Sequence, residues 1–341
     1  MSYVNKVVDK VYLINLDRDT ERLKKMTEQL TRLNIEFTRF PAVLGSEVKT
    51  SHHLSEFCLK YCTDGIKGCA LSHKTIWEDM LKNNYKHVLV LEDDAVFADD
   101  FEHMFKTGWD QVPKDFDIWY LGCNFKCTDT QTIPTLYNRA LGHTPQHIDT
   151  NIQRVYGSVG THGYIISNHC ARAFKHLPIY THIDAQMTVW LNKHELTAYS
   201  VKPLIINSPQ QEEHSGSNLA ESYPYILNGA LRKVPFSDTV SLDWGASENF
   251  AKIGGHNVNT LIFVMVLLVL LTYPKYYFLF AIWLLVEFLY SKDAKNTAKF
   301  ATFIGGAMVF KWVFHATAKE AETTMKRAGK GLANKVKSYF H

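Results

Sequence analysis

Short apolar runs alternate with helix-like segments over the first part of the chain. The apolar runs predict buried strands at residues 11–16 (VYLINL), 87–91 (HVLVL), 117–121 (DIWYL) and 163–167 (GYIIS). Behind the first run, apolar residues recur at helical spacing and predict a helix, at Leu23, Met26, Leu30 and Leu33. Because strands alternate with helices, we expect an α/β fold with a mostly parallel sheet that is covered on both faces. Ligands bind such sheets beyond the carboxyl ends of the strands.

The pattern changes sharply near residue 257. Residues 258–273 and 276–290 are almost continuously apolar, and Pro274-Lys275 separates them. Each run is short for a membrane span, which needs about 20 residues. A tight membrane hairpin, a re-entrant pair and a single tilted span therefore stay open, as does a buried helical hairpin in a soluble domain.

Two charged residues interrupt this hydrophobic region. Glu287 lies inside the second run, and Lys311 lies inside a third, less convincing stretch at residues 300–314. We expect three parts along the chain: a soluble domain at residues 1–249, hydrophobic membrane-associated helices at residues 257–316, and a tail at residues 317–341.

The tail is amphipathic and rich in lysine. Its apolar residues gather near one helical face, at Ala318, Ala321, Met325, Leu332, Val336 and Phe340. That pattern is typical of a helix on an anionic membrane surface, although a plain solvated helix also fits. Basic residues beside a membrane favour the cytoplasmic side, and residues 1–10 contain no apolar signal region. We therefore expect a membrane-associated protein whose first domain is cytoplasmic.

Composition narrows the classes of function. Hydrophobic residues make up 46% of the chain and charged residues 21%, which excludes a disordered chain. The net charge of +3 is too small to argue for a nucleic-acid partner. The six cysteines include Cys58-x3-Cys62 and Cys123-x3-Cys127, whose spacing is wider than in zinc knuckles. We expect buried free thiols, as in a reducing compartment.

The strongest chemical signal is the acidic triplet Glu92-Asp93-Asp94, which ends the apolar run at residues 87–91. Side chains alternate along a strand, so the first and third carboxylates point to the same side. They repel each other unless a cation lies between them. A hard divalent cation accepts such oxygen ligands and neutralises charge on a departing diphosphate. The alternative is a solvated acidic turn that caps the next helix.

Polar segments elsewhere predict contacts with a ligand. The segment NLDR at residues 15–18 closes the first predicted strand, and Arg22 follows one helical turn later. The segment GCALSH at residues 68–73 begins a helix with small residues, which suits close approach to a ligand. Asp184 precedes another predicted helix and either presents a carboxylate to the site or only caps the helix. His214 lies in a polar loop, as a metal or phosphate contact or as an ordinary exposed histidine.

Taken together, these segments resemble glycosyltransferase family 25. The resemblance rests on NLDRDTERL near the start, GCALSH, VLVLEDDAVF and the later ID dipeptide, in the right order over roughly residues 7–218. That family includes bacterial lipooligosaccharide galactosyltransferases and collagen galactosyltransferase domains. Its pattern does not account for the residues after about 249.

The resemblance implies a GT-A fold, which is a Rossmann-like nucleotide-binding α/β fold, for a catalytic domain at residues 1–249. It implies an inverting transfer of a hexose, most often galactose, from a UDP-sugar to an acceptor hydroxyl, usually with Mn²⁺ or else Mg²⁺. The acceptor is a glycan, a lipid-linked saccharide or a protein. Two alternatives stay open: a catalytically inactive module that binds nucleotide or glycan at a membrane, and a metal-dependent phosphoesterase with the same acidic cluster.

The family motifs also imply roles for individual residues. Glu92 and Asp94 match the metal-binding acidic motif, and His214, outside the motifs, is an extra candidate ligand. Asp184 is the candidate general base that takes the proton of the acceptor hydroxyl. The candidate donor-binding residues are Asn15, Asp17, Arg18, Arg22, Ser72, His73 and Asp93.

Overall fold

The structure is a computed structural model that describes residues 1–127, 136, 139–208, 224–235 and 241–314. The chain divides into two compact units. The first contains Met1–Glu221 and Ala230–Asn259, and the second contains Ser222–Gly229 and Thr260–His341. The expected domain boundary at residue 249 stays a prediction.

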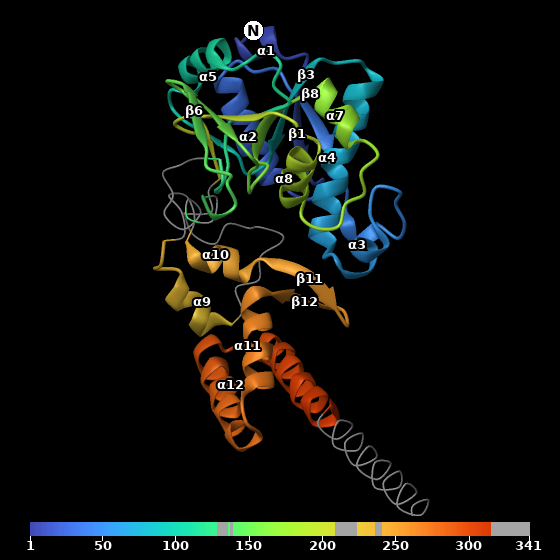
Figure 1. The fold of residues 1–341 in the computed structure, drawn as a ribbon, viewed down its shortest axis with the longest axis vertical. Coiled ribbons are helices and arrows are strands. Elements are labelled where there is room, and N and C mark those ends of the chain that lie inside the picture. The colour runs from blue at the N-terminus through green and yellow to red at the C-terminus, as the bar shows by residue number, and fades with distance from the viewer. Residues whose placement is uncertain (128–135, 137–138, 209–223, 236–240, 315–341) are drawn as a thin grey trace, which may run out of the picture. The chain divides into compact units, whose positions relative to one another are not determined.

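A mixed eight-stranded sheet forms the centre of the first unit (Figure 1). Its strands lie in the order β2-β1-β3-β8-β5-β9-β7-β6. β1 is parallel to β2 and β3, and β5 is parallel to β9, whereas the other neighbouring pairs are antiparallel. The strands are β1 (Lys10–Asn15), β2 (Thr38–Pro41), β3 (His87–Glu92), β5 (Ile118–Tyr120), β6 (Gln146–Asp149), β7 (Ile152–Val155), β8 (Gly163–Ser167) and β9 (Ala198–Val201).

This sheet confirms the expected α/β class but not the mostly parallel sheet. The difference arises because β8 lies between β3 and β5 and runs antiparallel to both. A strand that is buried on both faces has the same apolar composition in either direction, so the sequence pattern carries no sign of strand direction.

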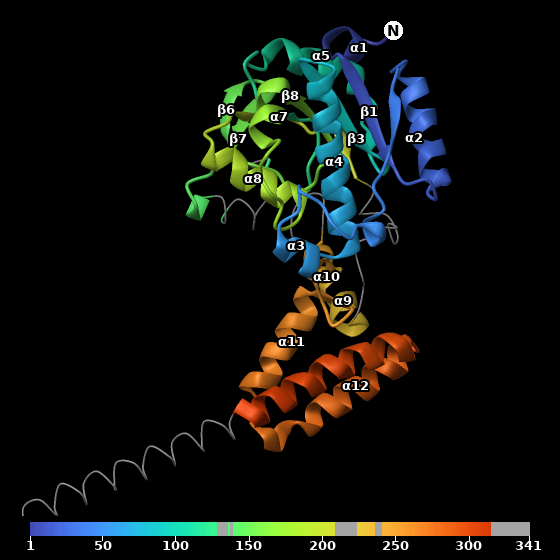
Figure 2. The same cartoon turned by 90° about the vertical axis from the view of Figure 1, so that its right-hand side faces the viewer.

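Helices cover both faces of the sheet, as the alternating pattern predicts (Figures 1 and 2). On β1, Tyr12 and Ile14 join one layer of buried side chains, while Val11 and Leu13 join the other. The first layer includes side chains of α3 (Glu56–Tyr61), α4 (Asp64–Lys82), α7 (Asn168–Phe174) and α8 (Ile183–Lys193). The second includes side chains of α1 (Val4–Val7), α2 (Thr20–Arg32) and α5 (Phe101–Gln111).

Four of the six cysteines are paired, which corrects the expectation of free thiols. Cys58 is bonded to Cys62 and Cys123 to Cys127, whereas Cys69 and Cys170 are free. The first pair spans one turn at the end of α3, where the two Cα atoms lie 4.6 Å apart. That separation lies within the range that a disulfide bridges. A spacing of four residues, too wide for a zinc knuckle, brings two cysteines together across a single helical turn.

Two smaller pairs of strands accompany the main sheet in the first unit. β4 (Val96–Phe97), which follows the acidic triplet, pairs antiparallel with β10 (Ile206–Asn207). β11 (Asn249–Ile253) and β12 (His256–Asn259) form a hairpin that follows α10 (Leu242–Ser247). Lys252 of this hairpin forms an ion pair with Asp64 at the start of α4, with Nζ and Oδ2 2.8 Å apart. The ion pair fastens the hairpin to α4.

The second unit is built from helices. They are the first part of α9 (Tyr225–Leu231), α11 (Thr260–Leu271), the short turn η3 (Pro274–Tyr276), α12 (Phe278–Ser291) and a helix at residues 294–314. Within the described part of the chain, none of the helices combines the length and the apolar character that crossing a membrane requires.

The charged residues inside the apolar runs bind helix ends of this unit. Glu287 is fully buried, and its carboxylate accepts hydrogen bonds from the backbone N–H groups of Tyr225 and Ile226 at the start of α9. These groups lack partners within a helix, so an acidic side chain there is stabilising. Lys311 donates from Nζ to the carbonyl of Thr272, just after α11, at 2.6 Å. The two charges that weakened the hydrophobic pattern therefore contribute to the folding of the unit.

Candidate functional site

The candidate site lies at the carboxyl ends of the parallel strands β1 and β3. The two strands are in register there, with Ile14 paired to Glu92, so Asn15 and the acidic triplet emerge side by side. A pocket of about 350 Å³ opens at this point, within the size range of small-molecule sites. Among the predicted residues, its lining includes Asn15, Arg18, Arg22, Ser72, His73, Glu92, Asp93 and Asp94.

Three predicted residues stand apart from this lining. Asp17 and Asp184 are described but do not line the pocket. His214 lies outside the described residues, so its predicted contact with a metal or phosphate stays a prediction.

Asp93 organises the donor side of the pocket. Its Oδ2 accepts a hydrogen bond from Asn15 Nδ2 at 2.7 Å, and its Oδ1 pairs with Arg22 Nη1 at 2.9 Å. Burial raises the pKa of Asp93. The hydrogen bond from Asn15 and the charge of Arg22 lower it by a smaller amount, so the pKa is raised overall. The carboxylate therefore holds a cation and an amide in place at the pocket wall.

Arg39 of β2 extends this network and was missed by the sequence analysis. Its Nε donates to Asn15 Oδ1 at 3.0 Å, and its Nη2 pairs with Asp17 Oδ1 at 2.5 Å. Asp17 is largely exposed, with 82% of its side chain accessible. Its carboxylate therefore orients Arg39 at the edge of the site. Arg39 is brought to the site by β2, which pairs in parallel with β1, and not by a sequence motif.

Gly45 and Gly68 allow the loop after β2 to lie directly against α4. A Cβ atom on Gly45 would lie 1.7 Å from the carbonyl oxygen of Asp64, and one on Gly68 would lie 2.5 Å from that of Val43. Ser72 completes this contact, because its Oγ accepts from Val43 N at 2.9 Å and donates to Gly68 O at 2.7 Å. Ser72 thus lines the pocket while its hydroxyl holds the pocket wall. Its predicted contact with a donor stays a prediction.

A chain of hydrogen bonds fixes the carboxylate of Glu92. His73 is buried, with Nδ1 2.8 Å from the hydroxyl of Tyr164 and Nε2 3.3 Å from Glu92 Oε1. Tyr164 also accepts a hydrogen bond from Trp77 Nε1 at 3.1 Å. The Tyr164 hydroxyl and the His73 ring thus connect Trp77 to Glu92 in one chain of polar contacts.

The two outer carboxylates of the triplet differ in the direction in which their pKa is shifted. Glu92 Oε1 also accepts a hydrogen bond from Thr161. Burial raises the pKa of Glu92, but the interactions with His73 and Thr161 lower it by more, so the pKa lies below the usual value. For Asp94, burial and then the negative charge of Glu92 raise the pKa to about 7. Among the described residues, Asp94 Oδ1 is shielded from solvent and has no hydrogen-bond partner.

These features fit a cation site. Two neighbouring carboxylates whose repulsion raises one pKa, and a shielded oxygen without a partner, are what a divalent cation would relieve. Cys69, His73 and Glu92 also place one ligand atom each within 4.8 Å of one another. The oxygen pair of Glu92 and Asp94 suits the hard cations Mn²⁺ or Mg²⁺, whereas the sulfur of Cys69 and the nitrogen of His73 suit softer ions.

Asp184 lies at the start of α8, and two backbone N–H groups hold its carboxylate. Oδ2 accepts from Gly160 at 2.8 Å, and Oδ1 accepts from Ala185 at 2.6 Å. Gly160 has a φ of +96°, a conformation that suits glycine, so the loop before β8 bends towards Asp184. Asp184 lies in the first turn of α8, whose N-cap residue is His182, so Asp184 is not the helix cap. Its predicted role as a general base stays a prediction.

Glu248, a carboxylate outside the pocket lining, interacts electrostatically with the site and was not predicted from the sequence. It follows α10, is half-buried, and interacts electrostatically with Asp184 and Glu92. Burial, followed by the charges of these two residues, raises the pKa of Glu248 to about 7. Nothing local in the sequence marks it, because its place depends on a hairpin held by the pair of Lys252 and Asp64.

The sequence also matches a family model. Residues 8–187, more than half of the chain, match the family described as Glycosyltransferase family 25 (LPS biosynthesis protein). The pocket residues and Asp184 fall within this match, whereas His214 and Glu248 lie beyond it.

Three similar proteins illustrate the extent of the likeness. Procollagen galactosyltransferase 2 of Homo sapiens is 25% identical over 276 residues, which cover 69% of this chain and 39% of that protein. A Glycosyltransferase 25 family member of Drosophila melanogaster is 28% identical over 228 residues, covering 58% and 35%. One of Anopheles gambiae is 38% identical over 98 residues, covering 26% and 17%. The chain spans well under half the length of each relative.

Proposed function

The chain belongs to glycosyltransferase family 25, and from this premise we propose that it transfers galactose from UDP-galactose to an acceptor hydroxyl, with inversion at the anomeric carbon. The observation that carries the proposal is the pocket at the ends of β1 and β3, where a cationic wall faces an acidic triplet. A relative named Procollagen galactosyltransferase 2 supports galactose as the sugar. The acceptor is a glycan, a lipid-linked saccharide or a protein.

The donor is expected to bind with its diphosphate along the cationic wall. Arg18 and Arg22 line the pocket and offset phosphate charge, and Asp93 holds Arg22 in place. Glu92 and Asp94 would hold Mn²⁺ or Mg²⁺, which supplies Lewis-acid stabilisation of the leaving diphosphate. A nucleotide bound at the carboxyl ends of parallel strands is the arrangement of a GT-A fold, which we propose for the first unit.

The transfer needs a base for the acceptor hydroxyl. Its oxygen forms a bond to the anomeric carbon while the bond from that carbon to the diphosphate oxygen breaks, and UDP leaves with the electron pair. The proton goes to a carboxylate, a step that typically contributes roughly 10²–10⁴-fold. We propose Asp184 as this base. Glu248 is the second candidate, because a carboxylate with a pKa of about 7 accepts a proton efficiently near neutral pH.

A direct assay separates this proposal from its alternatives. The full chain is incubated with UDP-galactose, Mn²⁺ and candidate acceptors, and both UDP release and the galactosylated product are measured. Other UDP-sugars serve as controls for the choice of sugar. Nucleotide binding without UDP release would identify an inactive binding module. Release of phosphate from simple phosphate esters, without sugar transfer, would identify a phosphoesterase.

We also propose that the second unit binds a membrane surface in its plane, with the first unit on the cytoplasmic side. Large apolar side chains are exposed on α11 and α12, among them Leu271, Phe278, Leu285 and Leu289. The lysine-rich sequence of residues 317–341 favours an anionic, cytoplasmic surface. Co-sedimentation of the full chain with phosphatidylserine vesicles tests the binding, and loss of residues 260–341 should abolish it.

The compartment has a separate test. Disulfides persist mainly in oxidising compartments, so the cytoplasmic proposal requires that the close pairs Cys58–Cys62 and Cys123–Cys127 be reduced in the cell. Alkylation of thiols in intact cells, followed by mass spectrometry, reports the state of these cysteines. Reduced thiols in the cell would support the cytoplasmic proposal, and bonded cysteines would overturn it.

A further inference from the structure

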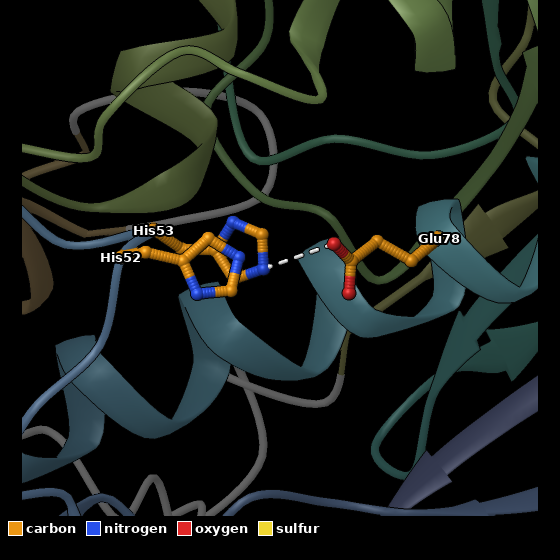
Figure 3. A group of neighbouring side chains, drawn as sticks. All are labelled: His52, His53 and Glu78. Atoms are coloured by element: carbon orange, nitrogen blue, oxygen red, sulfur yellow. Dashed lines mark ion pairs between the residues drawn. The ribbon is translucent and has the colours of Figure 1, made fainter.

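Two histidines and a glutamate form a cluster that the proposed reaction does not use. His52 and His53 lie in the loop before α3, and Glu78 lies on α4. The imidazole rings are 3.9 Å apart between centroids, and His53 Nε2 lies 3.3 Å from Glu78 Oε1 (Figure 3). The three side chains each place one nitrogen or oxygen within 4.8 Å of the others.

The backbone around this cluster is held in place. His53 accepts a hydrogen bond at its carbonyl from Ile179 N at 2.8 Å, and its own N–H donates to Ser51 Oγ at 3.2 Å. The next residue, Leu54, pairs with Ile179 in a β-bridge. Glu78 is fixed by the helix that bears it. Ligands on rigid backbone lose little freedom when an ion binds, which favours binding.

The ligand types select a transition metal. Two imidazoles and one carboxylate form the kind of three-ligand set that binds Zn²⁺ and leaves one position for water. Ligand atoms around a tetrahedral Zn²⁺ lie about 3.4 Å apart, given bonds of about 2.0–2.1 Å. The pair of His53 and Glu78 already meets this spacing. His52 is exposed, so a change of its rotamer can bring its ring nitrogen into the same range.

The electrostatic surroundings are compatible with an ion. His53 is buried, so little water competes with an ion for its ring nitrogen. Glu78 supplies a negative charge. Lys74 acts on the same histidine as a nearby cation, but its ammonium group donates to backbone carbonyls, including Leu177 O at 2.8 Å. Those carbonyl dipoles offset part of its charge at the cluster.

We propose that His52, His53 and Glu78 bind one Zn²⁺ ion, at a site separate from Glu92 and Asp94. The ion joins the loop before α3 to α4, the helix that also carries His73 of the donor pocket. The ion therefore stabilises the contact between that loop and α4 at one wall of the candidate active site. The expected signature is a rise in the melting temperature of the metal-free protein when Zn²⁺ is added.

The test is a count of zinc bound by the metal-free full chain and its variants. His52→Ala and Glu78→Gln alter an exposed and a half-buried side chain, so both variants should fold. His103→Ala removes an exposed histidine on α5 and is the matched control. Zinc content is measured after equilibrium dialysis, and affinity by calorimetric titration. Asp94→Ala is titrated in parallel, because it alters the other candidate cation site.

The proposal predicts that His52→Ala and Glu78→Gln bind one zinc ion fewer than His103→Ala, or bind it at least roughly tenfold more weakly. Both should also lose the thermal shift on Zn²⁺ addition, while Asp94→Ala retains it. Co²⁺ bound to the full chain should give the strong visible absorption of a tetrahedral site, and His52→Ala should remove it. Equal zinc content, affinity and thermal shift in all four variants would overturn the proposal, whatever the outcome of the galactosyltransferase assay.

Discussion

The parallel and antiparallel parts of the sheet contribute to the candidate site in different ways. In the parallel part, β1 and β3 end together and deliver Asn15 and the acidic triplet from the strand ends. In the antiparallel part, the contributing groups come from loops and helix starts, namely Thr161 before β8 and Asp184 on α8. The parallel part holds the charges that suit a nucleotide, and the antiparallel part supplies the carboxylate proposed for the acceptor. Mutations in the parallel part should therefore weaken nucleotide binding, whereas mutations in the antiparallel part should lower turnover.

The largest effect is expected on the parallel side. Asp94→Ala should abolish metal-dependent binding of UDP and lower kcat/KM by more than about 10³, because it removes the partner of Glu92 at the proposed cation site. The melting temperature should not fall, since Asp94 Oδ1 has no hydrogen-bond partner among the described residues and burial disfavours the charge that the change removes. Calorimetric titration with UDP and Mn²⁺ measures the binding.

The control for this change is Asp99→Ala, which removes an exposed aspartate a few residues further along. It should bind UDP like the unchanged protein. Retention of metal-dependent binding in Asp94→Ala would remove the assignment of a cation to the triplet.

On the antiparallel side, Asp184→Asn should lower kcat roughly 10²–10⁴-fold while UDP-galactose binding persists, because only the base for the acceptor is lost. Glu248→Gln is the paired variant. If Glu248 is the base, the two effects exchange. Steady-state kinetics with a fixed acceptor give kcat, and calorimetry gives binding. Near-normal kcat in both variants would place the base elsewhere.

Tyr164 links the two parts, and a smaller effect is expected there. Tyr164→Phe leaves His73 Nδ1 and Trp77 Nε1 without their shared partner, which should cost about 1–3 kcal/mol in the free energy of unfolding. Activity should fall by up to about tenfold, since Glu92 loses its fixed orientation. Tyr120→Phe is the control, because the buried Tyr120 hydroxyl has no partner among the residues described. Equal stability of the two variants, measured by urea unfolding, would contradict the proposed hydrogen-bond chain.

The smallest effect concerns pH. The pKa of Asp94 is raised to about 7 in the folded protein, so its folded form binds a proton more tightly than the unfolded chain does. That contribution to stability is complete below the pKa of the unfolded chain, near 3.8, and is lost progressively as the pH rises to about 7. Without metal, Asp94→Asn should therefore gain stability relative to the unchanged protein as the pH rises from about 4 to 7, and the difference should level off above pH 7. The gain is at most about 1.4 kcal/mol per pH unit, and it is measured by thermal unfolding. A constant difference would show an ordinary pKa.

The parallel side was also the more predictable one. Apolar runs located β1 and β3, and the rule that ligands bind beyond strand ends brought Asn15, Arg22 and the triplet together correctly. The antiparallel insertion of β8 and the approach of Glu248 could not be predicted, because both depend on contacts between residues far apart in the sequence. The disulfides were missed for a local reason, since the spacing was compared with zinc motifs alone.

The hydrophobic region teaches the same lesson. In the sequence, Glu287 interrupts an apolar run. In the structure, its carboxylate accepts hydrogen bonds from backbone N–H groups at the start of α9. Whether an apolar run meets lipid or protein depends on such partners, which lie far away in the chain.

Glu287 also has a practical consequence for anyone who shortens this protein. The peptide that it holds, around Tyr225, comes before the α10 and β11–β12 stretch of the first unit, so the two compact units are interleaved along the sequence. A single cut cannot release the C-terminal helices as one intact piece. Truncation after residue 259 would remove Glu287, whose carboxylate binds the start of α9. Limited proteolysis should accordingly yield fragments that stay associated until they are denatured.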